Sequence, residues 1–194
     1  RPARGLTMLI EPLALRTPIA TVNGGVFVSP ELSVIESHTL DPAIAAQSVE
    51  LMLDQGLDAW VYTATEWLVR NPNGPFVARE TFTLQFDSRV VPSFDSADIA
   101  HAVKIVGVSD DTQLIAASET IARTSLGAKV TAARSNPNFH DISDPRPDKR
   151  HALATMCRLW NIPSAHSVTS GTDSPAPPVF RARGRSDADG QSQA

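Results

Sequence analysis

The stretch Val103-Lys104-Ile105-Val106-Gly107-Val108-Ser109-Asp110-Asp111 decides the fold class. Its apolar run predicts a strand over residues 103–109, and the aspartates after it are typical of a helix N-cap. The next helix keeps small or apolar residues on one face as far as Gly127, namely Leu114, Ser118, Ile121, Ala122 and Ser125. A further strand over residues 129–134 completes a strand–helix–strand unit.

A second unit of the same kind precedes the first. Residues 26–28 are extended, and Asp41-Pro42 begins a helix, because an acceptor side chain at the cap and proline in the first turn favour helix initiation. Gly56 ends this helix, and residues 59–65 form the next strand. Two such units in succession predict an α/β layer with helices packed on one sheet.

The ends of the chain are less regular. We expect a short helix within residues 6–15, a strand over 18–22 and a tight turn at Asn23-Gly24-Gly25. Residues 79–95 are ambiguous. Further on, we expect a helix over 149–160 capped by Asp148, a short strand over 167–170, and disorder over 174–194, where large apolar residues are scarce.

Composition narrows the classes of partner. The 194 residues are 42% hydrophobic, enough for a packed core, and the formal net charge is −4. That charge gives no reason to expect nucleic acid or an anionic membrane, and no apolar stretch reaches the roughly 20 residues of a membrane span. The single cysteine, Cys157, cannot form an internal disulfide and suits a cytoplasmic protein. A small soluble ligand is the expected partner.

Several segments in the same order resemble the Cof-type branch of the haloacid dehalogenase (HAD) superfamily of phosphatases. Arg1-Pro2 resembles the residues after Thr-Gly in the family's second motif, and residues 17–25 resemble its strand and Asn-Gly-Ala turn at the start of the cap. Residues 104–111 resemble the central cap strand. Residues 141–145 and 149–153 resemble the return to the core and the third motif, Lys-Gly-x-Ala-Leu, with Arg150 in place of glycine.

The resemblance implies a partial Rossmann-like HAD core with an inserted α/β cap domain. Residues 1–25 would belong to the core, 26–140 to the cap, 141–173 to the core again, and 174–194 to the tail. It also implies a Mg²⁺-dependent phosphatase of small phosphorylated metabolites, such as sugar or cofactor phosphates. Lys149 matches the family's catalytic lysine, and its place at a helix N-terminus adds the backbone dipole to its attraction for phosphate.

Parts of the family's chemistry are missing from their expected places. The nucleophile motif, Asp-x-Asp-Gly-Thr, would precede Arg1, so we expect the chain to be N-terminally incomplete and inactive alone. Asp187-Ala188-Asp189-Gly190 has similar letters but does not end an apolar strand. Of the fourth motif's metal-binding carboxylates, Asp173 alone remains, one place out of register. A shifted reading frame after Gly171 would explain why the residues that follow it do not resemble the family.

Other residues are candidates for binding. Asn23 at the turn could reach substrate, and Arg134 and Asn136, at the end of a cap strand, could contact its phosphate or hydroxyl groups. The five histidines show neither the i, i+4 spacing nor the cysteine partners of zinc sites, so no metal is assigned to them. Two alternatives stay open: a non-catalytic module that binds a phosphometabolite or another protein, and a truncated remnant.

Overall fold

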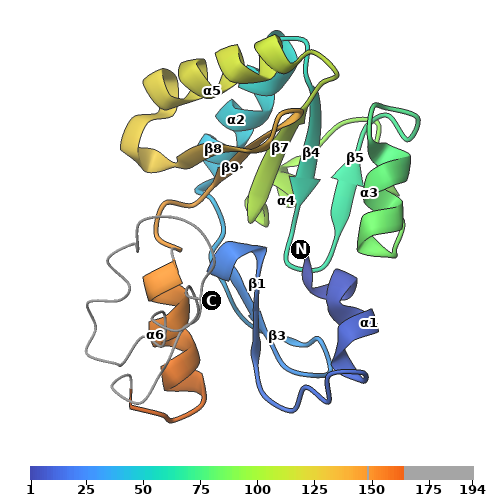
Figure 1. Ribbon diagram of the computed structural model, residues 1–194. Coiled ribbons are helices and arrows are strands. Elements are labelled where there is room, and N and C mark those ends of the chain that lie inside the picture. The colour runs from blue at the N-terminus through green and yellow to red at the C-terminus, as the bar shows by residue number, and fades with distance from the viewer. Residues whose placement is uncertain (148, 164–194) are drawn as a thin grey trace, which may run out of the picture.

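Two β-sheets organise the part of the chain that the computed structural model describes, which is residues 1–147 and 149–163, with the backbone alone for Lys149 and Arg150. In Figure 1 the upper sheet has six strands in the order β6-β5-β4-β7-β9-β8, and the lower sheet has three in the order β1-β2-β3. The strands are β1 (Ile19–Thr21), β2 (Val26–Val28), β3 (Val34–Ser37), β4 (Asp58–Tyr62), β5 (Trp67–Val69), β6 (Arg89–Val90), β7 (Lys104–Val108), β8 (Thr131–Asn136) and β9 (Phe139–Ser143). The α-helices are α1 (Thr7–Ile10), α2 (Pro42–Asp54), α3 (Val77–Leu84), α4 (Ser96–Ala100), α5 (Thr112–Leu126) and α6 (Lys149–Leu159), and 3₁₀ turns lie at η1 (Ala3–Leu6), η2 (Val22–Gly24) and η3 (Gly127–Lys129).

The six-stranded sheet contains the unit that the sequence predicted over residues 103–134. β9 lies between β7 and β8 and is antiparallel to both, so β7 and β8 run parallel, and α5 makes the crossover between them. β5 and β6 form a directly paired parallel edge, whereas β4 is antiparallel to both of its neighbours. The predicted α/β class is therefore confirmed.

The expectation of a single sheet is wrong for residues 26–65. β2 does not join β4 but pairs antiparallel with β1 and with β3, and Thr21 lies opposite Val26. The glycine-rich turn between β1 and β2 reverses the chain within a few residues, so each of these strands pairs with its neighbour in sequence. The lower sheet is thus a small meander, and the chain passes from it to the upper sheet before α2 begins.

The predicted helix caps at Asp41 and Asp111 are confirmed. Asp41 Oδ1 accepts hydrogen bonds from the backbone N–H groups of Ala43 (2.9 Å) and Ile44 (3.2 Å), and Asp111 caps α5 in the same way. The predicted helix over residues 6–15 is shorter, since α1 ends at Ile10, and Pro12, two residues later, has no backbone N–H to continue the helical hydrogen bonds. The strand expected over 59–65 ends at Tyr62, and the ambiguous segment contains α3 and β6. Asp148, the expected strand over 167–170 and the tail over 174–194 lie outside the described residues.

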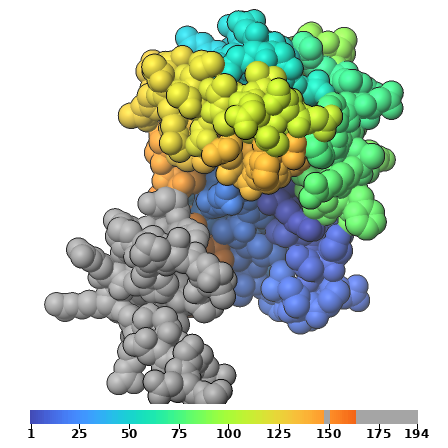
Figure 2. Space-filling model, turned by 45° about the horizontal axis from the view of Figure 1, so that its top comes forward, coloured from blue at the N-terminus to red at the C-terminus, as the bar shows by residue number. Residues whose placement is uncertain are grey.

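The two faces of the six-stranded sheet pack against different parts of the chain. One face is covered by α2, α4 and α5, and Gly107 allows close approach there, because a Cβ on it would lie 2.3 Å from Met52 Sδ. The other face carries Trp60 and Trp67 and packs on α3, Ala3 and β2. Figure 2 shows the outcome: the surface of the N-terminal segment, in blue, borders the orange surface of β8 and β9. The two sheets therefore share a second core.

The chain crosses between the lower and upper sheets at residues 38–41 and leaves the upper sheet again after Ser143. The domain division predicted at residues 25 and 140 stays a prediction. Strand pairing supports a shifted form of it, and we propose that the cap begins after β3 and ends after β9. Among the described residues, no helix has the length and apolar character to cross a membrane.

His140 is a fully buried histidine on the helix-covered face of the upper sheet. Its Nδ1 lies 3.0 Å from Ser118 Oγ, and its Nε2 has no hydrogen-bond partner among the described residues. Burial lowers the pKa of His140 below its usual value of 6.5, and the charges of Glu119 and Asp141 oppose this shift. The folded state therefore favours the neutral imidazole.

This shift predicts a loss of stability in mild acid. The pKa of His140 is lower in the folded state than in the unfolded state, so below about pH 6.5 the unfolded state binds a proton that the folded state does not. The unfolding free energy therefore falls as pH falls from about 6.5 toward the folded pKa, by at most about 1.4 kcal/mol per pH unit. The unfolding free energy, measured by urea denaturation, should change less between pH 8 and pH 5.5 in His140→Leu than in the wild type. His101→Gln, which changes an exposed histidine, should leave this pH dependence as it is in the wild type. Equal pH dependence in the wild type and His140→Leu would contradict the prediction.

Candidate active site

Three segments that are far apart in the sequence meet where the lower sheet ends. The backbone N–H of Val22 donates to the carbonyl of Arg1 (3.1 Å), which ties the start of the chain to η2. Helix α6 packs against η2 and β1. The structure therefore brings together the Arg1 segment, the Asn23 turn and the helix that begins at Lys149.

Asn23 lies exposed in this turn with φ 56° and ψ 31°, in the left-handed region. Asparagine tolerates that conformation better than other non-glycine residues, and Gly24 continues it with φ 87°. The Asn23 side chain thus faces solvent beside α6, where it could donate to an oxygen of a bound molecule.

Lys149 is the first residue of α6, as the sequence predicted, although its side chain lies outside the described atoms. A helix N-terminus carries partial positive charge from its unpaired N–H groups, and a lysine there strengthens its attraction for an anion. Asp173, the predicted metal ligand, lies outside the described residues. The roles of Lys149 and Asp173 stay predictions.

Arg134 and Asn136 lie away from this meeting point. The structure places both on β8, the edge strand of the upper sheet, where Arg134 Nε donates to Glu119 Oε2 on α5 (2.8 Å). Asn136 Oδ1 accepts from the backbone N–H of Asn138 and so shapes the β8–β9 turn. The structure does not bring these residues together with Asn23 or α6, and their predicted contact with substrate stays a prediction.

A polar cluster on the upper sheet was missed by the sequence analysis. Lys104 Nζ lies 3.1 Å from Asp141 Oδ2, and Ser135 Oγ donates to Asp141 Oδ1 (3.0 Å). The Lys104 ammonium also lies 4.9 Å from the centre of the Tyr62 ring, and the Tyr62 hydroxyl donates to Glu80 Oε1 (2.9 Å). We call Lys104, Asp141, Ser135, Tyr62 and Glu80 the cap cluster.

The cap cluster borders the Arg1 segment. The backbone amino group of Arg1 has a lowered pKa, because of burial first and the nearby Lys104 charge second, while Glu80 and Asp141 act in the opposite direction. Burial also raises the pKa of Tyr62, with the Glu80 carboxylate adding to the effect, so this hydroxyl remains a donor at neutral pH. The cluster therefore places a cation and carboxylates on the face turned to the lower sheet.

A cavity of about 390 Å³ opens beside β3 and the β4–β5 turn. Arg89 lines it, but its guanidinium pairs with Asp98 and lies 3.3 Å from Glu66 Oε1. An anion would have to displace a carboxylate to reach Arg89. We therefore do not place a phosphate there.

Mg²⁺, which the resemblance implies, does not fit the described side chains. Within residues 1–147 and 151–163, the grouping of side chains that could hold a metal ion consists of Glu36, His38 and His151. Two imidazoles and one carboxylate differ from the oxygen-rich set that Mg²⁺ prefers. We therefore derive no reaction step through Mg²⁺.

Comparisons with known proteins identify a matching family. Residues 1–174 match the sequence model of the haloacid dehalogenase-like hydrolases. Among curated proteins, none matches the chain.

Solved structures show a similar fold. A haloacid dehalogenase-like hydrolase from Bacteroides thetaiotaomicron has a TM-score of 0.77 at 20% identity, over 87% of this chain and 64% of that one. A hydrolase of the same description from B. subtilis gives 0.67 at 18% identity, over 87% of this chain and 67% of that one. A sugar phosphatase of HAD subclass IIB gives 0.67 at 15% identity, over 84% of this chain and 60% of that one. The matched part therefore spans about two thirds of these proteins' own length.

Proposed function

Because the chain belongs to the haloacid dehalogenase-like hydrolase family, we propose that it is the cap-bearing part of a phosphomonoesterase that acts on small phosphorylated metabolites. The fold is the one expected of a Cof-type member, with part of a Rossmann-like core and an α/β cap. The observation that carries the proposal is the convergence of the Arg1 segment, the Asn23 turn and the start of α6.

In this proposal the described elements bind and orient the phosphate group. The N-terminal turn of α6 supplies partial positive charge, and Lys149 supplies an ammonium that neutralises charge on the phosphoryl oxygens. Asn23 contributes an amide that can donate to a phosphate or hydroxyl oxygen. Each of these groups acts without covalent change, so the nucleophile has to come from elsewhere.

We further propose that this nucleophile is an aspartate outside the segments described here. Phosphoryl transfer through an aspartyl phosphate needs a carboxylate near the phosphate and a second one as acid and base. Asp144, close to α6 in sequence, is held by Arg146 Nε (2.7 Å) and Arg146 Nη2 (2.8 Å). Burial is the largest single influence and raises the pKa of Asp144, but the hydrogen bonds and charge of Arg146 together outweigh it. The pKa of Asp144 is therefore lowered, and both carboxylate oxygens are bonded to Arg146.

The cap cluster supports a small, hydroxyl-bearing substrate. Lys104 has further N–H groups that can donate, and Asp141 can accept from hydroxyl groups of a sugar or cofactor phosphate, whereas the Tyr62 hydroxyl is already bonded to Glu80. Trp60 and Val106 on the same face are buried, whereas the side chains of Lys104 and Asp141 are 23% and 15% exposed. We also propose a cytoplasmic location, because one cysteine cannot form an internal disulfide.

The test compares two proteins: residues 1–194, and an extended chain that includes whatever coding sequence is found upstream of Arg1. Both are assayed with Mg²⁺ on a panel of sugar and cofactor monophosphates, with a phosphodiester as the control substrate. We expect hydrolysis of monoesters by the extended chain alone. Robust turnover by residues 1–194 would refute the proposed origin of the nucleophile, and an inactive extended chain would refute the phosphatase assignment. Stabilisation of an inactive chain by a sugar phosphate would instead favour a binding module.

A further inference from the structure

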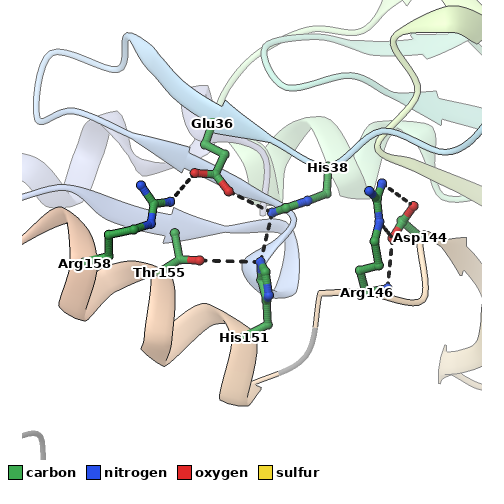
Figure 3. Close-up of polar contacts among 7 residues, drawn as sticks. All are labelled: Glu36, His38, Asp144, Arg146, His151, Thr155 and Arg158. Atoms are coloured by element: carbon green, nitrogen blue, oxygen red, sulfur yellow. Dashed lines mark hydrogen bonds and ion pairs between the residues drawn. The ribbon is translucent and has the colours of Figure 1, made fainter. Parts of the chain in front are cut away.

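Glu36, His38 and His151 form a compact group between the lower sheet and α6, shown in Figure 3. His38 Nε2 lies 3.1 Å from His151 Nε2 and 3.2 Å from Glu36 Oε1. One ligand atom from each of the three residues lies within 4.8 Å of the other two. All three side chains are partly buried, so the group is a site within the fold and not a set of solvated surface charges.

These separations are close to those around a bound zinc ion. Zinc lies about 2.0–2.1 Å from imidazole nitrogens in tetrahedral sites, which puts two ligand atoms about 3.3 Å apart. The distances from His38 Nε2 to its two neighbours differ from that value by only tenths of an ångström. The side chains thus need little movement to hold a cation.

Without a cation, His38 Nε2 cannot form good hydrogen bonds with both of its neighbours at once. A neutral imidazole nitrogen carries at most one proton, yet His38 Nε2 faces both a carboxylate oxygen and the Nε2 of a second imidazole. A single N–H cannot point well at both acceptors. A divalent cation placed among the three atoms would accept a lone pair from each, which resolves the conflict.

A neighbouring side chain holds part of the group in position. Arg158 Nη2 bonds to Glu36 Oε2, which leaves Oε1 directed at His38. Support of this kind orients metal ligands and strengthens binding. The sequence also suits the arrangement, since Glu36 and His38 are two positions apart and so project to the same side of an extended chain.

We propose that Glu36, His38 and His151 form a site for a zinc-class divalent cation, with water completing the coordination. Two imidazoles and one carboxylate favour Zn²⁺, Co²⁺ or Ni²⁺ over Mg²⁺. The site links the crossing between the sheets, at His38, to the helix that follows the chain's exit from the upper sheet, at His151. An ion there would fix the start of α6, two residues after Lys149, against β3. The proposal is independent of phosphatase activity.

The experiment measures metal binding by residues 1–194. Isothermal titration with Zn²⁺, with Mg²⁺ as the comparison metal, should show one Zn²⁺ site. Zn²⁺ affinity should fall at least about tenfold in Glu36→Gln, His38→Gln and His151→Gln, because even outer-shell changes at metal sites cost about 10–100-fold. The matched control is His101→Gln, an exposed histidine outside the group, which should bind Zn²⁺ as the wild type does.

A spectroscopic readout on the wild type avoids dependence on variants that fail to fold. Co²⁺ bound at the site should give ligand-field bands of low coordination number and no thiolate charge-transfer band, since Cys157 is not a ligand. A charge-transfer band would mean that Cys157 binds the ion, and the assignment would be wrong. The same holds if the wild type binds no Zn²⁺, or if a folded His38→Gln/His151→Gln double variant binds it with unchanged affinity.

Discussion

Replacing Trp60 by alanine is expected to lower the unfolding free energy by about 3–5 kcal/mol, as large-to-small changes of buried aromatic residues do. Trp60, on β4, is 1% exposed and lies at the centre of the core that the two sheets share. Its ring packs edge-on against Trp67 and Phe139, each with a centroid distance of 5.3 Å. The substitution would remove the ring contacts to Trp67 on β5 and to Phe139 on β9.

Urea denaturation followed by far-UV circular dichroism measures this loss without depending on tryptophan emission. Trp160→Ala is the matched control, because Trp160 lies just after α6 and is 38% exposed, and it should cost less than about 1 kcal/mol. A loss for Trp60→Ala no larger than that of the control would mean that the two sheets do not share a core at Trp60. The Arg1 segment and the cap cluster would then lack the packing that places them together.

Local chemistry explains the features that the sequence predicted well. The caps at Asp41 and Asp111 depend on side chains that bond to N–H groups two and three residues away, so the pattern contains the whole interaction. The strand β7 and the crossover α5 are predicted by the same kind of local pattern. The assignment of β2 failed because three apolar residues do not specify which strand they pair with.

The cap cluster and the histidine group could not be found by local reasoning. Lys104 and Asp141 are 37 positions apart, and His38 and His151 are 113 positions apart, so the sheet pairing and the packing of α6 bring them together. One usable signal was present. Glu36 and His38 have the two-residue spacing of a strand, whereas the spacing sought among the histidines was the i, i+4 spacing of a helix. A search for histidines at helical spacing therefore misses two ligands that lie in one extended segment.

Replacing Lys149 by methionine is expected to lower kcat/KM for monophosphates by about 10²–10³-fold in the extended chain, the usual cost of removing one group that stabilises charge in a transition state. Methionine keeps an unbranched side chain with good helix propensity, so α6 should still form. Steady-state kinetics on the best monoester substrate of the panel measures kcat/KM for the variant and the wild type. Lys149→Arg keeps the positive charge but replaces a compact ammonium with a planar guanidinium, so its decrease in kcat/KM should be smaller than that of Lys149→Met.

The control for Lys149 is Lys129→Met, which removes an exposed lysine at η3 and the same unit of charge. It should leave kcat/KM within about twofold, because exposed charges beyond about 10 Å are largely screened by salt. The contrast separates a lysine that touches the phosphate from the general effect of net charge on an anionic substrate. If both variants lost activity equally, Lys149 would act only through the overall field. If neither did, the cation that meets the phosphoryl oxygens would have to be sought elsewhere, and Lys104 of the cap cluster, 3.1 Å from Asp141, would be the first to test.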